Sequence, residues 1–140
     1  DCALTNQALA ERAPLSPATC LRRVRRLVDL GLVERQVALL NPDLLARATG
    51  AGLTAILEVT LDRQDAVALD AFEARVAPEP AVQQCYRVTA GPDFVLVVYV
   101  PDMPAYHGFV QRVLTAQVNV RNVRAFFSVK RSKFSPALPV

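Results

Sequence analysis

The sequence has few of the residue types that build metal, redox or catalytic sites. Its 140 residues include three cysteines, one histidine and no tryptophan. Cys2, Cys20 and Cys85 are spaced too widely for a zinc-ligand pattern or a Cys-x-x-Cys redox motif. His107 has no nucleophilic partner that the sequence suggests, so we expect it on the surface. We predict no metal, no cofactor and no catalytic residue, and expect Cys20 and Cys85 to be small buried hydrophobes.

Long apolar runs and targeting signals are also lacking. The strongest apolar run, residues 94–100, is far shorter than the roughly 18 residues that suggest a membrane span. With 52% hydrophobic and 21% charged residues, the chain can bury a real core. We therefore expect a soluble, cytoplasmic protein without a membrane partner. Because the chain starts at Asp1 and its one methionine is Met103, we expect the natural N-terminus upstream.

Acidic residues are scarce at both ends of the chain. Residues 1–40 hold six arginines and four acids, and residues 103–140 hold six lysines or arginines and no acid. Residues 41–102 hold four arginines and nine acids. Basic segments on both sides of an acidic middle predict a polyanionic partner.

The first 31 residues carry the start and stop signals of two consecutive helices. The pattern predicts a short helix over residues 5–13 that Pro14 ends. A second helix is predicted from the N-cap Ser16 to about Leu30, before Gly31. Two helices joined by about three residues form a helix-turn-helix.

The second of these helices has one apolar side and one basic side. At 100° per residue, its apolar residues gather on one side. Three guanidinium groups and a hydroxyl lie opposite, where a helix in the major groove meets phosphates and base edges. A solvated basic face is the alternative, but the helix-turn-helix context favours double-stranded DNA as the partner. The candidate DNA-binding residues are Ser16, Thr19, Arg22, Arg23 and Arg26.

The rest of the chain reads as a linker and an α+β domain. Residues 33–39 alternate weakly, as expected of a wing strand, and residues 41–52 read as a linker with a short helix closed by glycines. We therefore expect a DNA-binding domain at 1–40 and a second domain at 53–140. The predicted strands and helices of that domain are 53–61, 65–77, 82–88, 94–100, a helix capped by Asp102, and 123–130.

This order, βαββαβ, is the ferredoxin-like motif, so the predicted fold class is α+β with an N-terminal winged helix-turn-helix. The strands offer more apolar surface than two helices on one side of a sheet can cover. Packing of sheet against sheet in a dimer would cover the excess, for which the candidate residues are Leu57, Val59, Val97 and Tyr99.

Four segments together resemble the leucine-responsive/asparagine-regulator (Lrp/AsnC) transcription factors. They are LTNQALAERAPLSPATCLRRVRRLVDLGLV at 4–33, LNPDLL at 40–45, VTAGPDFVLVV at 88–98 and FFSVKRSKFSPALPV at 126–140. The resemblance implies a homodimer, often assembling to a tetramer or octamer, that binds partly palindromic DNA and responds to an amino acid. The family normally has another helix ahead of Leu4, so we expect residues missing there.

The turn between the second and third predicted strands is the candidate effector site. An amino acid needs an acceptor for its ammonium group and backbone N–H groups for its carboxylate. The resemblance implies that effectors bind at this turn, although the family's usual glycine is Ala90 here. A tight turn without a ligand is the alternative. The candidate effector-binding residues are Thr89, Gly91 and Asp93.

Two other functions remain open from the sequence. Siroheme decarboxylases of haem biosynthesis resemble the same two-domain architecture, and such an enzyme would bind a tetrapyrrole. A ligand-binding module without DNA activity is the other alternative.

Overall fold

The computed structural model describes residues 4–50, 52–116 and 119–136 of the chain. It divides into two compact units, Asp1–Leu40 and Asn41–Val140.

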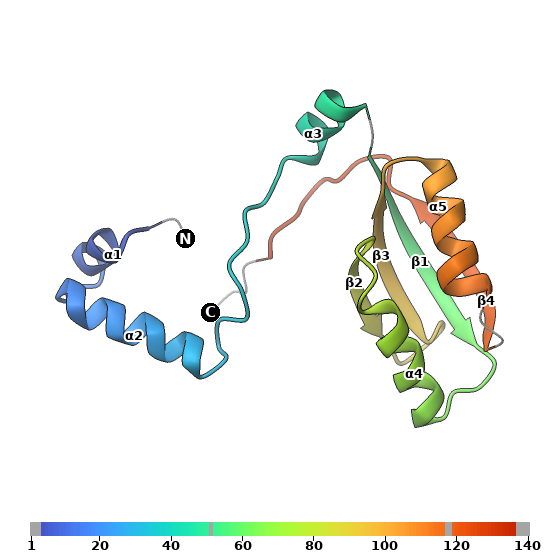
Figure 1. The fold of residues 1–140 in the computed structure, drawn as a ribbon, viewed down its shortest axis with the longest axis horizontal. Helices are drawn as coiled ribbons and strands as arrows, with labels where there is room; N and C mark the ends of the chain where they lie inside the picture. The colour runs from blue at the N-terminus through green and yellow to red at the C-terminus, as the bar shows by residue number, and fades with distance from the viewer. Residues whose placement is uncertain (1–3, 51, 117–118, 137–140) are drawn as a thin grey trace. The chain divides into compact units, whose positions relative to one another are not determined.

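The N-terminal unit is a pair of short helices, α1 (Asn6–Arg12) and α2 (Pro17–Asp29). Both begin at the predicted caps: the Thr5 hydroxyl accepts a hydrogen bond from the Ala8 N–H, and the Ser16 hydroxyl accepts one from the Thr19 N–H. Beyond α2, Gly31 has a positive φ of 71°, which glycine adopts without strain. The predicted helix-turn-helix is confirmed (Figure 1).

The expected wing strand over residues 33–39 is absent from this structure. These residues have no regular secondary structure, and Val37 and Leu39 are exposed. A strand forms only with a pairing partner, and seven residues before the next helix are too few for both arms of a stable hairpin. The weak alternation therefore did not predict a strand correctly.

The C-terminal unit is a four-stranded antiparallel sheet with helices on one face (Figure 1). The order along the sheet is β2-β3-β1-β4, which confirms the βαββαβ prediction and places the apolar strand β3 in the interior. A short helix, α3, precedes the sheet. The bounds are α3 Pro42–Thr49, β1 Leu53–Leu61, α4 Ala66–Val76, β2 Val82–Arg87, β3 Phe94–Val100, α5 Met103–Phe109, η1 Val110–Thr115 and β4 Val120–Phe127.

The core lies between the sheet and its helices. Every second residue of β1 and β3 faces inward, and Leu57, Val59 and Phe94 are fully buried. Phe72 of α4 packs its ring 4.5 Å from that of Phe94. Each such side chain, once fully buried, contributes about 1.5–3 kcal/mol to the free energy of unfolding. Because nearly all the buried hydrophobic residues belong to this unit, it holds most of the described core.

The two faces of the sheet correct one of the sequence predictions. Leu57 and Val59 point toward the helices, not toward the outer face. Val97 and Tyr99 do lie on the outer face, because they alternate along β3 with its buried residues. Their partners on β1, Ile56 and Thr54, likewise alternate with the buried residues of that strand. The outer apolar patch comprises Ile56, Tyr86, Val95, Val97, Tyr99 and Phe126, of which Ile56, Tyr86 and Phe126 are 40–54% exposed.

The last strand begins earlier than predicted, at Val120 instead of residue 123. The register of β4 against β1 shifts between Thr60 and Leu61, so one residue there has no direct partner. Arg121 and Asn122, at this irregular start, broke the apolar alternation on which the prediction relied.

The helix that Asp102 caps changes its winding after Phe109. Residues Val110–Thr115 form a π-helical segment, η1, and the carbonyls of its last turn have no donor within the helix. The Arg75 guanidinium of α4 donates to the carbonyls of Arg112 and Val113, at 2.8 and 3.1 Å. This side chain joins α4 to η1.

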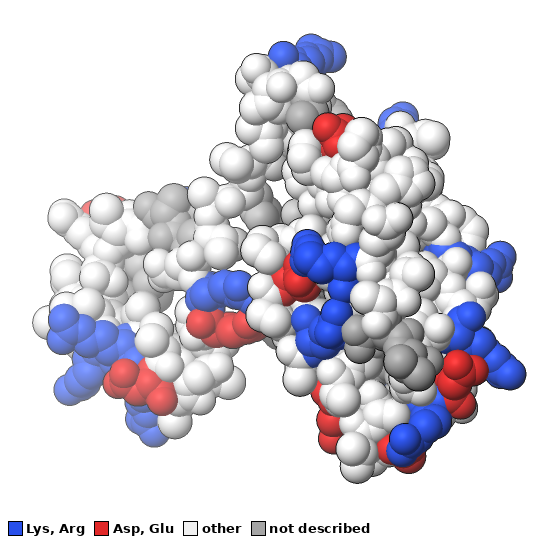
Figure 2. Space-filling model, turned by 45° about the vertical axis from the view of Figure 1, so that its right-hand side comes forward, with Lys and Arg blue, Asp and Glu red and all other residues white. Residues whose placement is uncertain are grey.

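Five of the ten basic side chains of the C-terminal unit lie beside carboxylates. On the side that Figure 2 shows, several blue groups lie next to red ones. These pairs are largely exposed, so each contributes about 0–1 kcal/mol to stability. They join Arg63 to Asp65, Arg87 to Asp70 and Glu73, Arg112 to Glu79, Arg121 to Asp62, and Arg124 to Glu58.

Candidate DNA-binding and effector sites

The basic side of α2 is fully available to a partner. Arg22, Arg23 and Arg26 are exposed, as is Arg25. Within residues 4–50, 52–116 and 119–136, none of these four guanidinium groups makes an ion pair or a hydrogen bond. Cys20, on the other side of the helix, is 3% exposed. The helix therefore presents four uncompensated positive charges away from its buried side.

Ser16 and Thr19 lie at the start of the same helix and are engaged with each other. The Ser16 hydroxyl accepts from the Thr19 N–H at 3.2 Å and donates to the Thr19 hydroxyl at 2.9 Å. Ser16 is exposed and Thr19 is half-buried. Their immediate role is to fix the first turn of α2, which positions the arginines that follow.

The apolar side of α2 is only partly covered. Leu27 and Val28 are 43% and 48% exposed. In the described part of the N-terminal unit, the buried hydrophobic residues are Ala10 and Cys20 alone. This unit therefore has little core of its own.

The turn between β2 and β3 brings the three predicted effector residues to one edge of the sheet. Thr89 and Gly91 are exposed, and Gly91 has a φ of 93°. A Cβ atom at Gly91 would meet no atom within 4 Å, so the backbone there is open to approach. The turn closes through the Val88 N–H, which donates to the Asp93 carbonyl at 3.0 Å.

Asp93 also ties this turn to the end of β1. Its carboxylate oxygen Oδ2 accepts a hydrogen bond from the Leu61 N–H at 2.7 Å and one from the Gln64 side chain at 3.3 Å. Its own N–H donates to the Val59 carbonyl at 2.9 Å. Sequence reasoning chose Asp93 as an ammonium acceptor and missed this role in the fold.

A cavity of about 560 Å³ lies beside this junction. Its volume is in the range of small-molecule pockets. Leu61 from β1 and Phe72 from α4 form part of its apolar lining. The full lining comprises Leu61, Asp62, Arg63, Val67, Ala68, Ala71, Phe72, Asn119 and Val120.

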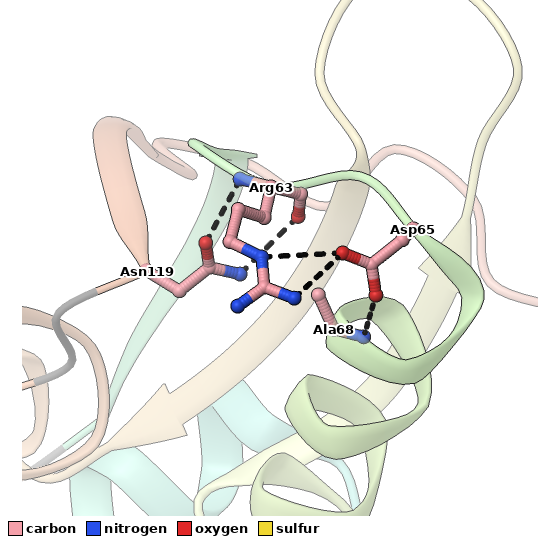
Figure 3. A network of polar contacts seen from close by, with 4 residues as sticks. All are labelled: Arg63, Asp65, Ala68 and Asn119. Carbon is pink, nitrogen blue, oxygen red and sulfur yellow. Dashed lines mark hydrogen bonds and ion pairs between the residues drawn. The ribbon is translucent and has the colours of Figure 1, made fainter.

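A network of polar contacts holds the rim of the cavity (Figure 3). Asn119 accepts from the Arg63 N–H at 2.8 Å and donates to the Arg63 carbonyl at 3.2 Å. The Arg63 guanidinium binds the Asp65 carboxylate, which also accepts from the Ala68 N–H at 2.9 Å. The hydrogen bond from Ala68, followed by that from Arg63, lowers the pKa of Asp65 below its ordinary value.

Sequence reasoning placed Asp65 at a helix start but missed Arg63 and Asn119 as a pair. The two residues are 56 positions apart, so only the fold brings them together. The available signal was Asn119 itself, a polar residue directly before the last strand.

The histidine and the described cysteines lie outside these two candidate sites. His107 is exposed, as predicted. Cys20 is buried, as predicted, whereas Cys85 is only half-buried because β2 is an edge strand. Desolvation, and then the charge of Glu73, raise the pKa of the Cys85 thiol, while Arg87 lowers it.

Residues 4–50, 52–116 and 119–136 offer neither a metal-ion cluster nor a membrane-spanning helix. No cluster of three or more His, Cys, Asp or Glu side chains there could hold a metal ion. No helix there is long and apolar enough to span a membrane.

Residues 54–138 match the sequence profile of the Lrp/AsnC ligand binding domain, and residues 1–34 match that of a winged helix-turn-helix DNA-binding domain. The chain belongs to the Lrp/AsnC family. It is a DNA-binding transcriptional regulator with a ligand-binding domain, as the sequence predicted.

Several curated Lrp/AsnC relatives match over nearly the whole chain. The leucine-responsive regulatory protein of Rhizobium meliloti is 38% identical over 130 residues, which cover 93% of this chain and 81% of the relative. The protein of that name from Escherichia coli K12 is 33% identical, over 98% and 81% of the two chains.

Solved structures agree with this assignment. A transcriptional regulator from Neisseria meningitidis, in complex with L-methionine, is 35% identical and superposes with a TM-score of 0.83 over 98% of this chain and 86% of that one. A feast or famine regulatory protein from M. tuberculosis, also complexed with L-methionine, is 29% identical with a TM-score of 0.80, over 99% and 88% of the two chains.

Proposed function

We propose that this regulator contacts double-stranded DNA through the basic side of α2. The main observation in support is that α2, a helix of the helix-turn-helix, exposes guanidinium groups on the side opposite its buried residues. These groups have no carboxylate partner within the described residues. Such groups pair bidentately with guanine O6 and N7 and also bind phosphate. The contacting residues are Arg22, Arg23 and Arg26, with Ser16 and Thr19 at the start of the helix.

Substitution of the arginines tests this interface. Arg22→Ala or Arg26→Ala should each weaken binding by about 1–3 kcal/mol if the residue reads a base, or reduce the salt slope by about one if it contacts phosphate. The probe is the duplex upstream of the protein's own gene, in a gel shift. Arg47→Ala, an exposed arginine at the end of α3, is the control with the same change of charge. Equal affinity and salt dependence of the double variant and the wild type would refute the interface.

The effector is an amino acid bound at the turn containing Thr89, Gly91 and Asp93, where it meets a neighbouring subunit. Three observations support this site. Oδ1 of Asp93 makes no hydrogen bond within the described residues, so it is free to accept from an ammonium group. The Gly91 backbone is open. Two family members crystallised with L-methionine, so an amino acid is a suitable ligand for this architecture.

A pair of glycine substitutions separates ligand binding from backbone strain. Gly91 and Gly50 have positive φ values of 93° and 68°, and a Cβ at either would meet no atom within 4 Å. Alanine at either position adds backbone strain of about 1–2 kcal/mol, but only Gly91→Ala places a methyl group at the turn. In calorimetry with the twenty amino acids, Gly91→Ala should lose binding and Gly50→Ala should keep it. Equal affinities would place the effector elsewhere, with the rim of the cavity at Arg63 and Asn119 as the next site to substitute.

The ligand-binding domain also joins two copies of the chain, through the outer apolar patch of the sheet. An exposed apolar patch of this kind is typical of a protein–protein interface. The assembly is a homodimer that can pair further into a tetramer or octamer. A fragment of residues 52–140 should sediment as a dimer or larger at tens of micromolar, and a monomer would refute this.

A charge within the patch gives a sharper test of the dimer. Ile56→Glu places a carboxylate on the outer face, where pairing of two sheets would bury it. Met103→Glu, at an exposed position on α5, is the control. The first substitution should yield monomers and the second should not.

The corresponding division of the chain is a DNA-binding part at 1–40, a linker at 41–52 and an effector-binding and oligomerisation part at 53–140. We infer regulation and not catalysis, in the cytoplasm where the DNA is, because the curated relatives are transcriptional regulators. Visible absorption by a bound tetrapyrrole would instead support the decarboxylase alternative.

A further inference from the structure

The basic residues after position 103 fall into two groups of three. The first group is neutralised by carboxylates of the same unit: Arg112 pairs with Glu79 at 2.8 Å, Arg121 with Asp62 at 3.4 Å, and Arg124 with Glu58 at 3.3 Å. These cations support the fold and leave little net charge for a partner.

The second group, Lys130, Arg131 and Lys133, has no such partners. It lies in residues 128–136, which have no helix or strand. All three side chains are exposed, and no ion pair to them exists among the residues that the structure describes. Because no acidic residue follows Asp102 in the sequence, the segment cannot neutralise itself.

Two contacts hold parts of this segment in place, one at its first residue and one at its aromatic residue. The Ser128 N–H donates to the Thr54 carbonyl at 2.9 Å, which fixes where the segment leaves the sheet. Further along, the Arg131 guanidinium lies 4.9 Å from the centre of the Phe134 ring. A guanidinium stacked in this way keeps its N–H groups available to an anion.

We propose that residues 128–136 are a second DNA-contacting segment, which binds the phosphate backbone without reading bases. The chemistry fits a line of phosphates: exposed cations on an extended backbone, with no pocket that would select a particular group. An anionic membrane is the less suitable polyanion, because lipid-binding segments usually gather about 4–8 basic residues and this one has fewer. The proposal does not depend on which residues of α2 contact the bases.

Neutralisation of the three cations in the full chain tests the proposal. The variant is Lys130→Gln, Arg131→Gln and Lys133→Gln together. Binding is measured by fluorescence anisotropy at several salt concentrations, with two labelled duplexes of about 60 base pairs: the DNA upstream of the gene and a scrambled sequence of the same composition. The matched control exchanges the same residues with charge retained: Lys130→Arg, Arg131→Lys and Lys133→Arg.

Loss of three phosphate contacts per subunit should lower the slope of log K against log salt by up to about 2.7 for each subunit that contacts the duplex, since each contact contributes about 0.9. Between 50 and 200 mM salt, the wild type should then lose about 40-fold more affinity than the glutamine variant for each subunit that contacts the duplex. The ratio of affinities for the two duplexes should be unchanged, and the control should behave as the wild type.

Three outcomes would overturn the proposal. One is an unchanged salt slope of the glutamine variant. Another is a lower slope together with a changed sedimentation coefficient of the free protein, which would assign the segment to assembly. The third is an unchanged slope with loss of binding to phosphatidylserine vesicles, which would assign it to a membrane.

Discussion

Asp93 illustrates how one residue can serve both the fold and a candidate site. Its Oδ2 holds the end of β1 through the Leu61 N–H, while Oδ1 makes no hydrogen bond to any residue that the structure describes. From sequence, an aspartate after a Gly-Pro turn could be recognised as a ligand-binding candidate. Its second role could not, because Leu61 is 32 positions away and only strand register brings the two together.

We expect Asp93→Ala to destabilise the ligand-binding domain. Without the carboxylate, the Leu61 N–H at the end of β1 loses its acceptor, which costs about 1–3 kcal/mol. Asp93→Asn retains an acceptor oxygen and should cost less. Urea unfolding followed by circular dichroism measures both, and equal loss in the two variants would contradict this account.

Cys85 should react slowly with alkylating reagents at pH 8. Burial and the charge of Glu73 raise the pKa of its thiol, so less of the reactive thiolate is present than in an unfolded chain. The measurement needs a single-thiol protein, with Cys2→Ser and Cys20→Ala. Iodoacetamide should react faster after unfolding in urea, and Glu73→Gln should speed the reaction in the native protein. A native rate equal to the unfolded rate would argue against the raised pKa.

Among the elements, those with local start signals were predictable and those that depend on pairing were not. Ser16 and Asp102 cap helices just as their sequence contexts indicate, because a cap needs only the next three residues. The strand expected at 33–39 and the start of β4 depend on pairing with another strand, which local sequence does not show, and neither was predicted correctly. The π-helical segment has no sequence signal that we can identify.

The Asp65 cap should make α4 sensitive to acid. Its lowered pKa means that the folded state favours the carboxylate, so the stabilisation is present above the unfolded value of 3.8 and is lost as the pH falls through the folded value. Between pH 5 and 3, Asp65→Asn should therefore lose less stability than the wild type. Urea midpoints at each pH test this, and parallel curves would contradict it.

Arg75 should matter to the helix pair more than an exposed arginine usually does. Its guanidinium donates to two carbonyls near the end of the π-helical segment, those of Arg112 and Val113. Arg75→Met keeps the apolar stem and removes both donors, so we expect a loss of about 1–3 kcal/mol. Arg63→Met, at an exposed ion pair, serves as the comparison and should cost less than about 1 kcal/mol. Similar losses in the two variants would exclude a special role for Arg75.

At the scale of the whole molecule, the core is distributed very unevenly. The order of strands and helices was predictable because periodicity reveals each element and βαββαβ permits few topologies. The outer apolar patch was only half predictable, because Val97 and Tyr99 were placed correctly whereas Leu57 and Val59 were not. Alternation along a strand shows which residues share a face of the sheet, but it does not show which face is the outer one.

This distribution predicts a large difference in hydrogen exchange within one chain. Amides of α1 and α2 should exchange much faster than those of β1 and β3, because the described N-terminal unit buries only Ala10 and Cys20. Adding a saturating DNA duplex should slow exchange in α2 and leave β1 and β3 unchanged. Mass spectrometry of peptic fragments resolves these segments, and uniform protection of the free protein would contradict the prediction.

The position of β1 in the sheet also has a consequence in time. It is the first strand of the sheet to be synthesised, yet both strands that flank it, β3 and β4, come much later in the chain. At roughly 5–20 residues per second, Phe127 leaves the ribosome several seconds after Leu61. Until Val100 has emerged, the apolar segment LTAILEVTL has neither neighbour, and until Phe127 has emerged it has only β3. It is therefore the part of the nascent chain most exposed to aggregation and to capture by chaperones.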